Sequence, residues 1–288
     1  MDARGGPELW QAVVFHSVDA VGNPTGVVFG AGGFDAAARQ RWAALLGFPD
    51  TVFLDRSAGQ EGWNAETFSP SQPISFCIQT LLASAAVLRL RGDTRKDRET
   101  FLVGGRRLEA GALPGAPPGV EWLPLARKEV CVLREGVLPR SLRPAAAAAG
   151  VVVDAGRRRL YLELASRGEL EGASLAAPEV LAFCREEELH GVCLFARTGP
   201  AEAALRVFTT SLDGHEDAAT GGAVAGLSVL LDPAGRPDGT EWTVRQGHGP
   251  PHRRGRLFLR CEPAEEQLWV GGRVRVLAAG RLLMGAEG

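Results

Sequence analysis

Two segments of the chain share one pattern of polar and apolar positions. Residues 65–90 and 205–231 each begin with a strand-like run, continue through a polar turn and end in an apolar stretch rich in small residues. The strand-like runs end at Phe68 and Phe208, which mark equivalent points of the two copies. In the second copy no charge occurs between Thr220 and Asp232, which predicts about three turns of buried helix. A repeat at half the chain length predicts two similar lobes, each built around one buried helix.

Short β-type runs separated by turns make up most of the remaining pattern. Two further helices are expected, one capped by Asp35 and ending at Gly47, and one over 178–187 with proline in its first turn. Many short strands with only two long apolar helices argue for the α+β class and against a doubly wound sheet. The runs that predict strands are 10–18, 25–29, 51–54, 65–68, 100–103, 107–110, 151–153, 160–164, 192–195, 205–208, 241–246, 256–261, 267–270 and 274–277.

The chain of 288 residues is long enough for two lobes, each with its own core. We expect an N-terminal lobe over 1–126 with its central helix at about 78–90, and a C-terminal lobe over 127–277 with its central helix at about 219–231. The tail, 278–288, is expected to return to the N-terminal lobe. The N-termini of the two central helices are expected to face one another across a cleft.

Composition narrows the class of protein. A hydrophobic content of 45% and a charged content of 23% are typical of a soluble globular protein, and no apolar run is long enough to span a membrane. The net charge of -2 gives no electrostatic reason to expect a nucleic acid or an anionic membrane as partner. No apolar signal-peptide region is present, and the 5 cysteines lack disulfide or zinc spacing, so a cytoplasmic location is expected.

The turn before the second buried helix is the first candidate site. Glu216 and Asp217 come just before the helix, and the amide groups of Thr220, Gly221 and Gly222 would point out of its N-terminus. A carboxylate or phosphate could be held there, since glycines allow close approach. Alternatively, Asp217 and Thr220 are ordinary helix-capping residues. A second isolated carboxylate, Asp50, follows Pro49 at a loop-to-strand junction, where an acidic turn residue is also commonplace.

Four segments, in order, resemble the phenazine-biosynthesis (PhzF-like) family of isomerases, which is structurally related to diaminopimelate epimerase. They are Gly22-Asn23-Pro24, the run PDTVFL, the run FSPSQPISFCIQTLLASAAVL and the run HEDAATGGAVAGLSVLL. The resemblance spans nearly the whole chain, including Gln246-Gly247 and a late Val-Gly-Gly. It implies a diaminopimelate epimerase-like fold of two pseudo-symmetric lobes, each a mostly antiparallel β-barrel-like sheet wrapped around a central helix. It further implies a cleft between the lobes, no cofactor or metal, and a homodimer.

The resemblance implies that Asp50 occupies the position of the family's general acid/base, which is a glutamate one methylene longer. The family's Cys-Gly-His is here Cys77-Ile78-Gln79, and the amide of Gln79 cannot shuttle a proton at neutral pH. Ile78 would crowd the first helix N-terminus, so a substrate carboxylate is more easily held by the second. There a family serine is replaced by Gly222.

These matches lead to a set of expected site residues. Asp50, Asp217 and Gln79 are expected to act in catalysis, with Asp50 moving the proton and the other two orienting the substrate or the acid. His215 is either a replacement for the imidazole absent at position 79 or an exposed turn residue. Cys77 has either thiolate character or the role of a small buried hydrophobe. The residues expected to contact substrate are Asn23, Cys77, Ile78, His215, Glu216, Thr220, Gly221 and Gly222.

The predicted function is a cofactor-independent isomerase that shifts a proton and a double bond in a small conjugated carboxylate. An unsaturated proline derivative of antibiotic-type secondary metabolism fits this chemistry by association. The first alternative is a catalytically silent relative that binds a small acid or a protein partner. The second is an amino-acid racemase that uses Asp50 or Cys77; a two-thiol racemase is disfavoured, because Ala218 stands at the second thiol position.

Overall fold

The computed structural model describes residues 6–57, 61–94, 96–137, 142, 150–231, 240–262 and 266–283. The chain forms two compact units. Unit 1 consists of residues 1–16, 23–123 and 272–288, and unit 2 consists of residues 17–22 and 124–271. The chain therefore leaves unit 1 within strand β8 (Val120–Ala126) and returns within strand β17 (Gln267–Arg281). Residues 17–22 belong to unit 2 although both flanking strands belong to unit 1.

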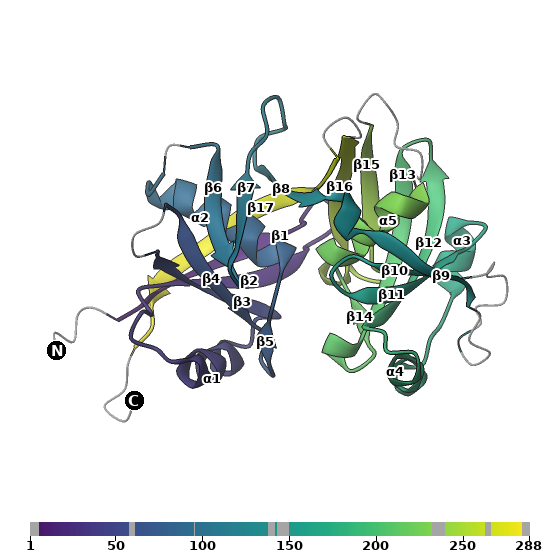
Figure 1. Ribbon diagram of the computed structural model, residues 1–288, viewed down its shortest axis with the longest axis horizontal. Coiled ribbons are helices and arrows are strands. Elements are labelled where there is room, and N and C mark those ends of the chain that lie inside the picture. Colours follow the sequence, from purple (N-terminus) through teal and green to yellow (C-terminus); the bar gives the residue numbers. More distant parts are fainter. Residues whose placement is uncertain are drawn as a thin grey trace. The chain divides into compact units, whose positions relative to one another are not determined.

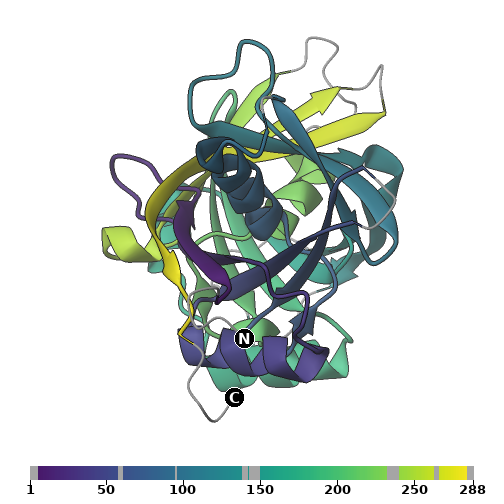
Figure 2. The same cartoon turned by 90° about the vertical axis from the view of Figure 1, so that its left-hand side faces the viewer.

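Unit 1 is a β-barrel around helix α2 (Ile78–Arg91; Figure 1). Strand β1 pairs antiparallel with β2 and with β17, and β17 also pairs with β8, which closes the barrel. Figure 2 shows β17, in yellow, running beside β1, in purple. Parallel pairs occur between β2 and β3 and between β4 and β6. The other strands of this unit are β2 (Asn23–Phe29), β3 (Asp50–Arg56), β4 (Trp63–Phe68), β5 (Pro73–Ile74), β6 (Arg98–Val103) and β7 (Arg106–Gly111).

The helices of unit 1 differ in their surroundings, as their sequences predict. Residues from Ile78 to Leu88 of α2 are almost all buried, because the helix is apolar on every side. Helix α1 (Ala36–Leu46) packs against β3 and β4 and buries only Arg39 and Ala43. The predicted caps of α1 are confirmed: Asp35 accepts a hydrogen bond from the Ala38 amide, and Gly47 ends the helix at a φ of 68°.

Unit 2 repeats this plan around helix α5 (Gly221–Leu231), whose residues are mostly buried. A continuous series of paired strands runs through β9, β10, β11, β12, β13, β15 and β16, and only β11–β12 and β13–β15 are parallel among these pairs. Helices α3 (Arg167–Gly172) and α4 (Ala177–Glu186) pack against β12 and β13. The strands are β9 (Cys131–Val137), β10 (Gly150–Asp154), β11 (Arg158–Glu163), β12 (Gly191–Gly199), β13 (Glu202–Thr209), β14 (Glu216–Asp217), β15 (Glu241–Gln246) and β16 (Gly255–Glu262).

In the core of unit 2, strand β11 and the central helix α5 are in close contact. The hydroxyl group of Tyr161, fully buried on β11, donates a hydrogen bond to the carbonyl oxygen of Ala223 at 2.9 Å. A Cβ atom at Gly226, on the next turn of α5, would lie 2.1 Å from the Tyr161 oxygen. Glycine at position 226 is therefore required for this close approach.

The predicted repeat is present in detail. In unit 1, β4 pairs with the two-residue strand β5, and α2 follows. In unit 2, β13 pairs with the two-residue strand β14, and α5 follows. Phe68 and Phe208 occupy equivalent places, since each pairs with a residue of the short strand. The α+β class and the barrel-like sheets around central helices are therefore confirmed.

Several local predictions need correction. Residues 267–270 and 274–277 belong to one strand, because the glycines between them continue the extended backbone. Glu216 and Asp217 were expected in a turn and instead form β14. Strands β8 and β9 and helix α3 were not predicted. The first strand ends at Val14 rather than at residue 18, since Phe15 has a φ of 66°. No helix in the described part of the chain is long and apolar enough to cross a membrane.

Candidate active site

Unit 1 brings a carboxylate and a thiol together at the start of its central helix. Asp50 is the first residue of β3, and Cys77 is the residue before α2. The Cys77 thiol donates a hydrogen bond to Asp50 Oδ2, with an Sγ to Oδ2 distance of 3.6 Å. Both residues are half-buried. The structure thus places the predicted general acid/base beside the N-terminus of α2.

The protonation state of Cys77 follows from this geometry. Burial raises the pKa of the Cys77 thiol well above its usual range, and the negative charge of Asp50 raises it further. The thiol is therefore neutral at physiological pH and acts as a donor to the carboxylate. Of the two interpretations of Cys77, the structure favours a neutral thiol over a reactive thiolate.

The side chain of Gln79 is buried and contacts strand β2. Gln79 Nε2 donates to the Thr25 hydroxyl at 2.8 Å and to the Pro24 carbonyl oxygen at 3.2 Å. Gln79 Oε1 accepts from Asn23 Nδ2 at 3.3 Å. The amide group of Gln79 therefore connects the first turn of α2 to the start of β2, where Asn23 is the first residue. A role of Gln79 toward a substrate stays a prediction. The neighbouring Ile78 is also buried, at 3% exposed.

Unit 2 arranges a polar cluster at the start of α5. Thr220 Oγ1 donates to Asp217 Oδ2 at 2.6 Å, and the Thr220 amide donates to Gln246 Oε1 at 2.8 Å. Gln246 Nε2 donates to the Asp217 carbonyl oxygen and to Thr220 Oγ1, both at 2.9 Å. Gln246 is only 1% exposed, so these bonds hold β14 and the helix entry firmly in place. The helix-capping interpretation of Thr220 and the anion-binding interpretation of the next two amides are compatible with this arrangement.

The side chains of Glu216 and His215 lie in different environments. The Glu216 carboxylate forms a two-point ion pair with Arg206, with distances of 3.0 Å to Nε and 2.8 Å to Nη2. The side chains are 6% and 9% exposed, respectively, and Arg206 Nη1 also donates to the carbonyl oxygens of Leu170 and Ala173. His215 is exposed, and its described hydrogen bonds are made by its backbone. Substrate contact by either side chain stays a prediction.

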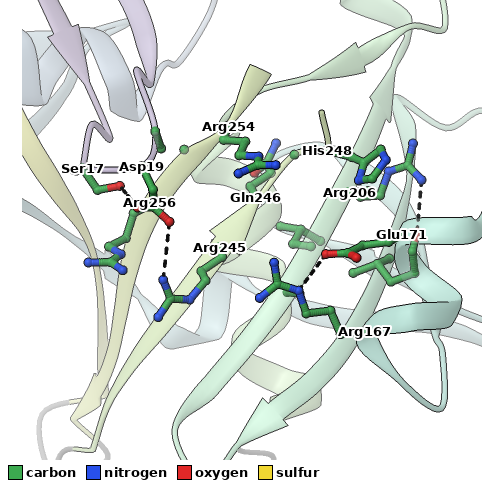
Figure 3. Close-up of a pocket in the computed structure, with 16 residues that line it drawn as sticks. Ser17, Asp19, Arg167, Glu171, Arg206, Arg245, Gln246, His248, Arg254 and Arg256 are labelled. Carbon is green, nitrogen blue, oxygen red and sulfur yellow. Dashed lines mark hydrogen bonds and ion pairs between the residues drawn. The ribbon is translucent and has the colours of Figure 1, made fainter. Parts of the chain in front are cut away.

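Unit 2 contains a small cavity of about 50 Å³, and Gln246 is one of the residues that line it (Figure 3). Five arginines line it, and three of them are paired with carboxylates. The pairs are Arg206–Glu216, Arg167–Glu171 at 2.7 Å and Arg245–Asp19 at 3.9 Å. Asp19 belongs to the segment 17–22, whose backbone amides at Val21 and Gly22 donate to the carbonyl oxygens of Pro251 and Arg254. The cavity is thus lined by ion pairs. Gln246 lies between the cavity and the start of α5, because it lines the cavity and also accepts a hydrogen bond from the Thr220 amide.

Two important residues escaped the sequence prediction of the site. Gln246 was noted only as part of a family resemblance, and Arg206 was not considered. Gln246 stands on the same face of its strand as the apolar Trp242 and Val244, and a polar residue at that inward position is the signal that could have indicated it. No group of three or more His, Cys, Asp or Glu suited to a metal ion occurs among the residues that the structure describes.

Comparison with known proteins gives a consistent result. The model of a family described as phenazine biosynthesis-like proteins (PhzC-PhzF) matches residues 13–280. An uncharacterized isomerase from Deinococcus radiodurans is 30% identical over 244 residues, which cover 78% of this chain and 76% of that protein.

Solved structures show the same fold. A phenazine biosynthesis protein of the PhzF family from Enterococcus faecalis superposes with a TM-score of 0.78 at 18% identity, covering 97% of this chain and all 100% of that one. A hydroxyproline epimerase from Agrobacterium vitis, solved with trans-4-hydroxy-L-proline, superposes with a TM-score of 0.66 at 11% identity, covering 99% and 94% of the two chains.

Proposed function

Because the chain belongs to the phenazine biosynthesis-like (PhzF) family and is an isomerase of that family, we propose that it shifts a proton and a double bond within a small conjugated carboxylate. Asp50 removes the proton from one carbon of the substrate and returns it to another. Asp217 orients the substrate or the acid. The proposed reaction needs only a general acid/base and an anion site, so no cofactor is invoked.

The observation that carries the proposal is the pairing of Asp50 with the neutral thiol of Cys77. Asp50 accepts this hydrogen bond through Oδ2, and the two oxygens of a carboxylate offer about four lone-pair sites in total. Because the thiol holds its proton, only Asp50 of the pair is suited to accept one. This supports a one-base isomerase over a racemase that uses two bases on opposite faces of one carbon.

The start of α5 supports the second half of the proposal. When a proton leaves a carbon conjugated to a carboxylate, negative charge spreads onto the carboxylate oxygens. The amide groups of Gly221 and Gly222 and the positive end of the helix dipole would stabilise that charge. Asp217 and Gln246 hold Thr220, and thereby the first amides of α5, in a fixed orientation. The helix entry is therefore preorganised for an anion.

The proposed substrate belongs to a class of small unsaturated acids. An unsaturated proline derivative from antibiotic-type secondary metabolism combines a conjugated system with a carboxylate, as the proposed chemistry requires. A cytoplasmic location and a homodimeric assembly belong to the same proposal. The partner of the protein in this view is a small-molecule carboxylate, rather than a nucleic acid or a membrane.

The test is incubation of a panel of small unsaturated carboxylates, unsaturated proline derivatives included, with the protein in deuterated water. Proton-transfer isomerisation would incorporate deuterium and shift the ultraviolet absorbance, since the conjugated system changes. Incorporation with loss of optical rotation and no absorbance change would instead identify an amino-acid racemase. Binding without any deuterium incorporation would identify a catalytically silent small-acid binder and would refute the proposed isomerisation.

A further inference from the structure

Unit 2 contains a buried cation that has no counter-ion among the described residues. Arg159, on β11, is 4% exposed. Its Nε atom has no hydrogen-bond partner among the described residues, and its Nη1 makes one long bond of 3.4 Å to the Arg157 carbonyl oxygen. No carboxylate of the described residues lies within ion-pair distance of its guanidinium group. A buried charge in this state is costly, so an anion bound beside it would stabilise it.

Two acidic groups near Arg159, the Tyr161 hydroxyl and the Cys193 thiol, keep their protons near neutral pH. Burial raises the pKa of the Tyr161 hydroxyl well above its usual value. Burial also raises the pKa of the nearby Cys193 thiol, to about 12. Neither group therefore supplies a negative charge to Arg159 near neutral pH.

The guanidinium of Arg159 lies beside the first turn of α5. A Cβ atom built on Gly222 would be 3.4 Å from Arg159 Nη1 and 3.6 Å from Nη2. Gly222 is half-buried, and the helix entry carries the positive end of the α5 dipole. Two positive features, the guanidinium and the helix N-terminus, thus lie close together. An anion that contacts both would remove this repulsion and fill the hydrogen-bonding capacity of Arg159.

We propose that Arg159, together with the amides of Gly221 and Gly222, forms a carboxylate-binding subsite that receives the carboxylate of the substrate. This assignment rests on the proposed isomerase function and adds the cation that recognises the substrate. A guanidinium presents paired N–H donors that match the two oxygens of a carboxylate. A Cβ atom at position 222 would already touch the guanidinium, and a larger side chain would extend against it, so glycine leaves this side of Arg159 accessible.

The experiment measures binding of two simple probes, benzoate and acetate, by calorimetry to the full-length protein. We expect the wild type to bind at least one of them, and Arg159→Met to weaken that binding by about 10- to 100-fold, as loss of a charge-assisted pair predicts. Arg159→Lys, which keeps the charge and loses the fork, should fall between the two. Benzamide, the neutral counterpart of benzoate, should bind the wild type and Arg159→Met equally weakly.

The matched control is Arg158→Met, on the same strand with its side chain 51% exposed and directed to Asp154 and Glu188. It should bind the probes as the wild type does. Gly222→Val provides a second route that keeps Arg159, and it should weaken binding because its apolar side chain extends toward the guanidinium and offers no hydrogen bond to an anion. This variant decides the question if Arg159→Met does not fold.

Equal probe affinity in wild type, Arg159→Met and Gly222→Val would overturn the subsite, and so would the absence of probe binding by the wild type. The proposed function is tested separately by Asp50→Asn, which should bind the probes normally and lose deuterium incorporation. A protein that isomerises its substrate but binds probes independently of Arg159 would keep the function and lose the subsite. A protein that binds the probes through Arg159 but incorporates no deuterium into any tested carboxylate would support the subsite and contradict the proposed function.

Discussion

The Cys77 thiol and the Asp50 carboxylate share one hydrogen bond, 3.6 Å long, between the entry of helix α2 and the first residue of strand β3. The bond joins residues that are 27 positions apart in the chain. Burial of the thiol and the negative charge of Asp50 keep the proton of the pair on sulfur, so Asp50 is the base of the pair.

Replacement of Asp50 by asparagine removes the base and keeps the shape of the side chain. We expect the rate of deuterium incorporation into substrate to fall by about two to four orders of magnitude, the range typical of a general base. Asp50→Glu, which restores the residue of the resembling family, should retain more activity than Asp50→Asn. Near wild-type exchange by Asp50→Asn would rule out this base.

The raised pKa of Cys77 predicts slow alkylation. Thiolate is the reactive form, so Cys77 should stay unmodified by iodoacetamide between about pH 7 and 9, near the usual thiol pKa. Exposed Cys131 is the internal comparison and should react within the same sample. Peptide mass spectrometry measures both sites. Asp50→Asn removes one cause of the raised pKa and should speed the reaction at Cys77, while burial, the larger cause, keeps it slower than Cys131. Rapid wild-type modification of Cys77 would contradict this account.

The same pKa shift predicts a loss of stability at alkaline pH. The folded-state pKa of Cys77 is raised, so its contribution to stability is complete below the unfolded-state value of about 9 and declines as the pH rises beyond it. Urea denaturation of wild type and Cys77→Ala between pH 7 and 10 measures the effect. The free energy of unfolding should fall more steeply with pH in the wild type than in Cys77→Ala. Parallel curves would show that Cys77 does not contribute.

Glu216→Gln should destabilise the protein by about 3–5 kcal/mol, because it leaves the buried guanidinium of Arg206 without its counter-charge. The free energy of unfolding in urea is the measurement. Glu163→Gln is the matched control, since Glu163 pairs with Arg197 at the surface, and it should cost at most about 1 kcal/mol. Equal small losses in both variants would show that the Arg206 pair is not a structural anchor.

Gly226→Ala should lower the free energy of unfolding by about 1–3 kcal/mol, the usual cost of overpacking a core. The added methyl group would meet Tyr161, which β11 and its hydrogen bond to Ala223 hold in place. The gain in helix propensity, about 1 kcal/mol, does not offset this clash. Gly172→Ala in α3 is the control, since nothing lies within 4 Å of its added Cβ, and it should be neutral or stabilising. A stabilising Gly226→Ala would refute the close contact.

The sequence predicted those features of the fold that depend on neighbours in the chain. The pattern around Phe68 and Phe208 indicated both central helices, and Asp35 and Gly47 marked the ends of α1. The continuity of β17 was missed because paired glycines usually interrupt a strand. In the structure, Gly272 is needed where a Cβ would come within 2.3 Å of the Phe15 ring. A glycine that looks like a breaker in sequence is here a site of close packing between strands.

The candidate site was only partly predictable, because its hydrogen bonds join distant positions. Asp50 and Asp217 could be located by resemblance to a family. Gln79, however, finds its partners 54 to 56 residues earlier in the chain, and Gln246 bonds to Thr220, 26 residues away. Arg159 lies on a strand whose pattern gave no reason to single out one arginine. Such relations exist only after the sheets have closed around their helices.

The position of strand β17 has a consequence for synthesis of the protein on the ribosome. The barrel of unit 1 closes only when β17 pairs with β1, and that pairing joins Glu8 to Arg281. Nascent chains fold as segments emerge, so most of unit 2 has left the ribosome before the last strand of unit 1 is available. We therefore expect the half that is translated first to be the half that matures last, with β1 and β2 held in an open sheet until translation is nearly complete.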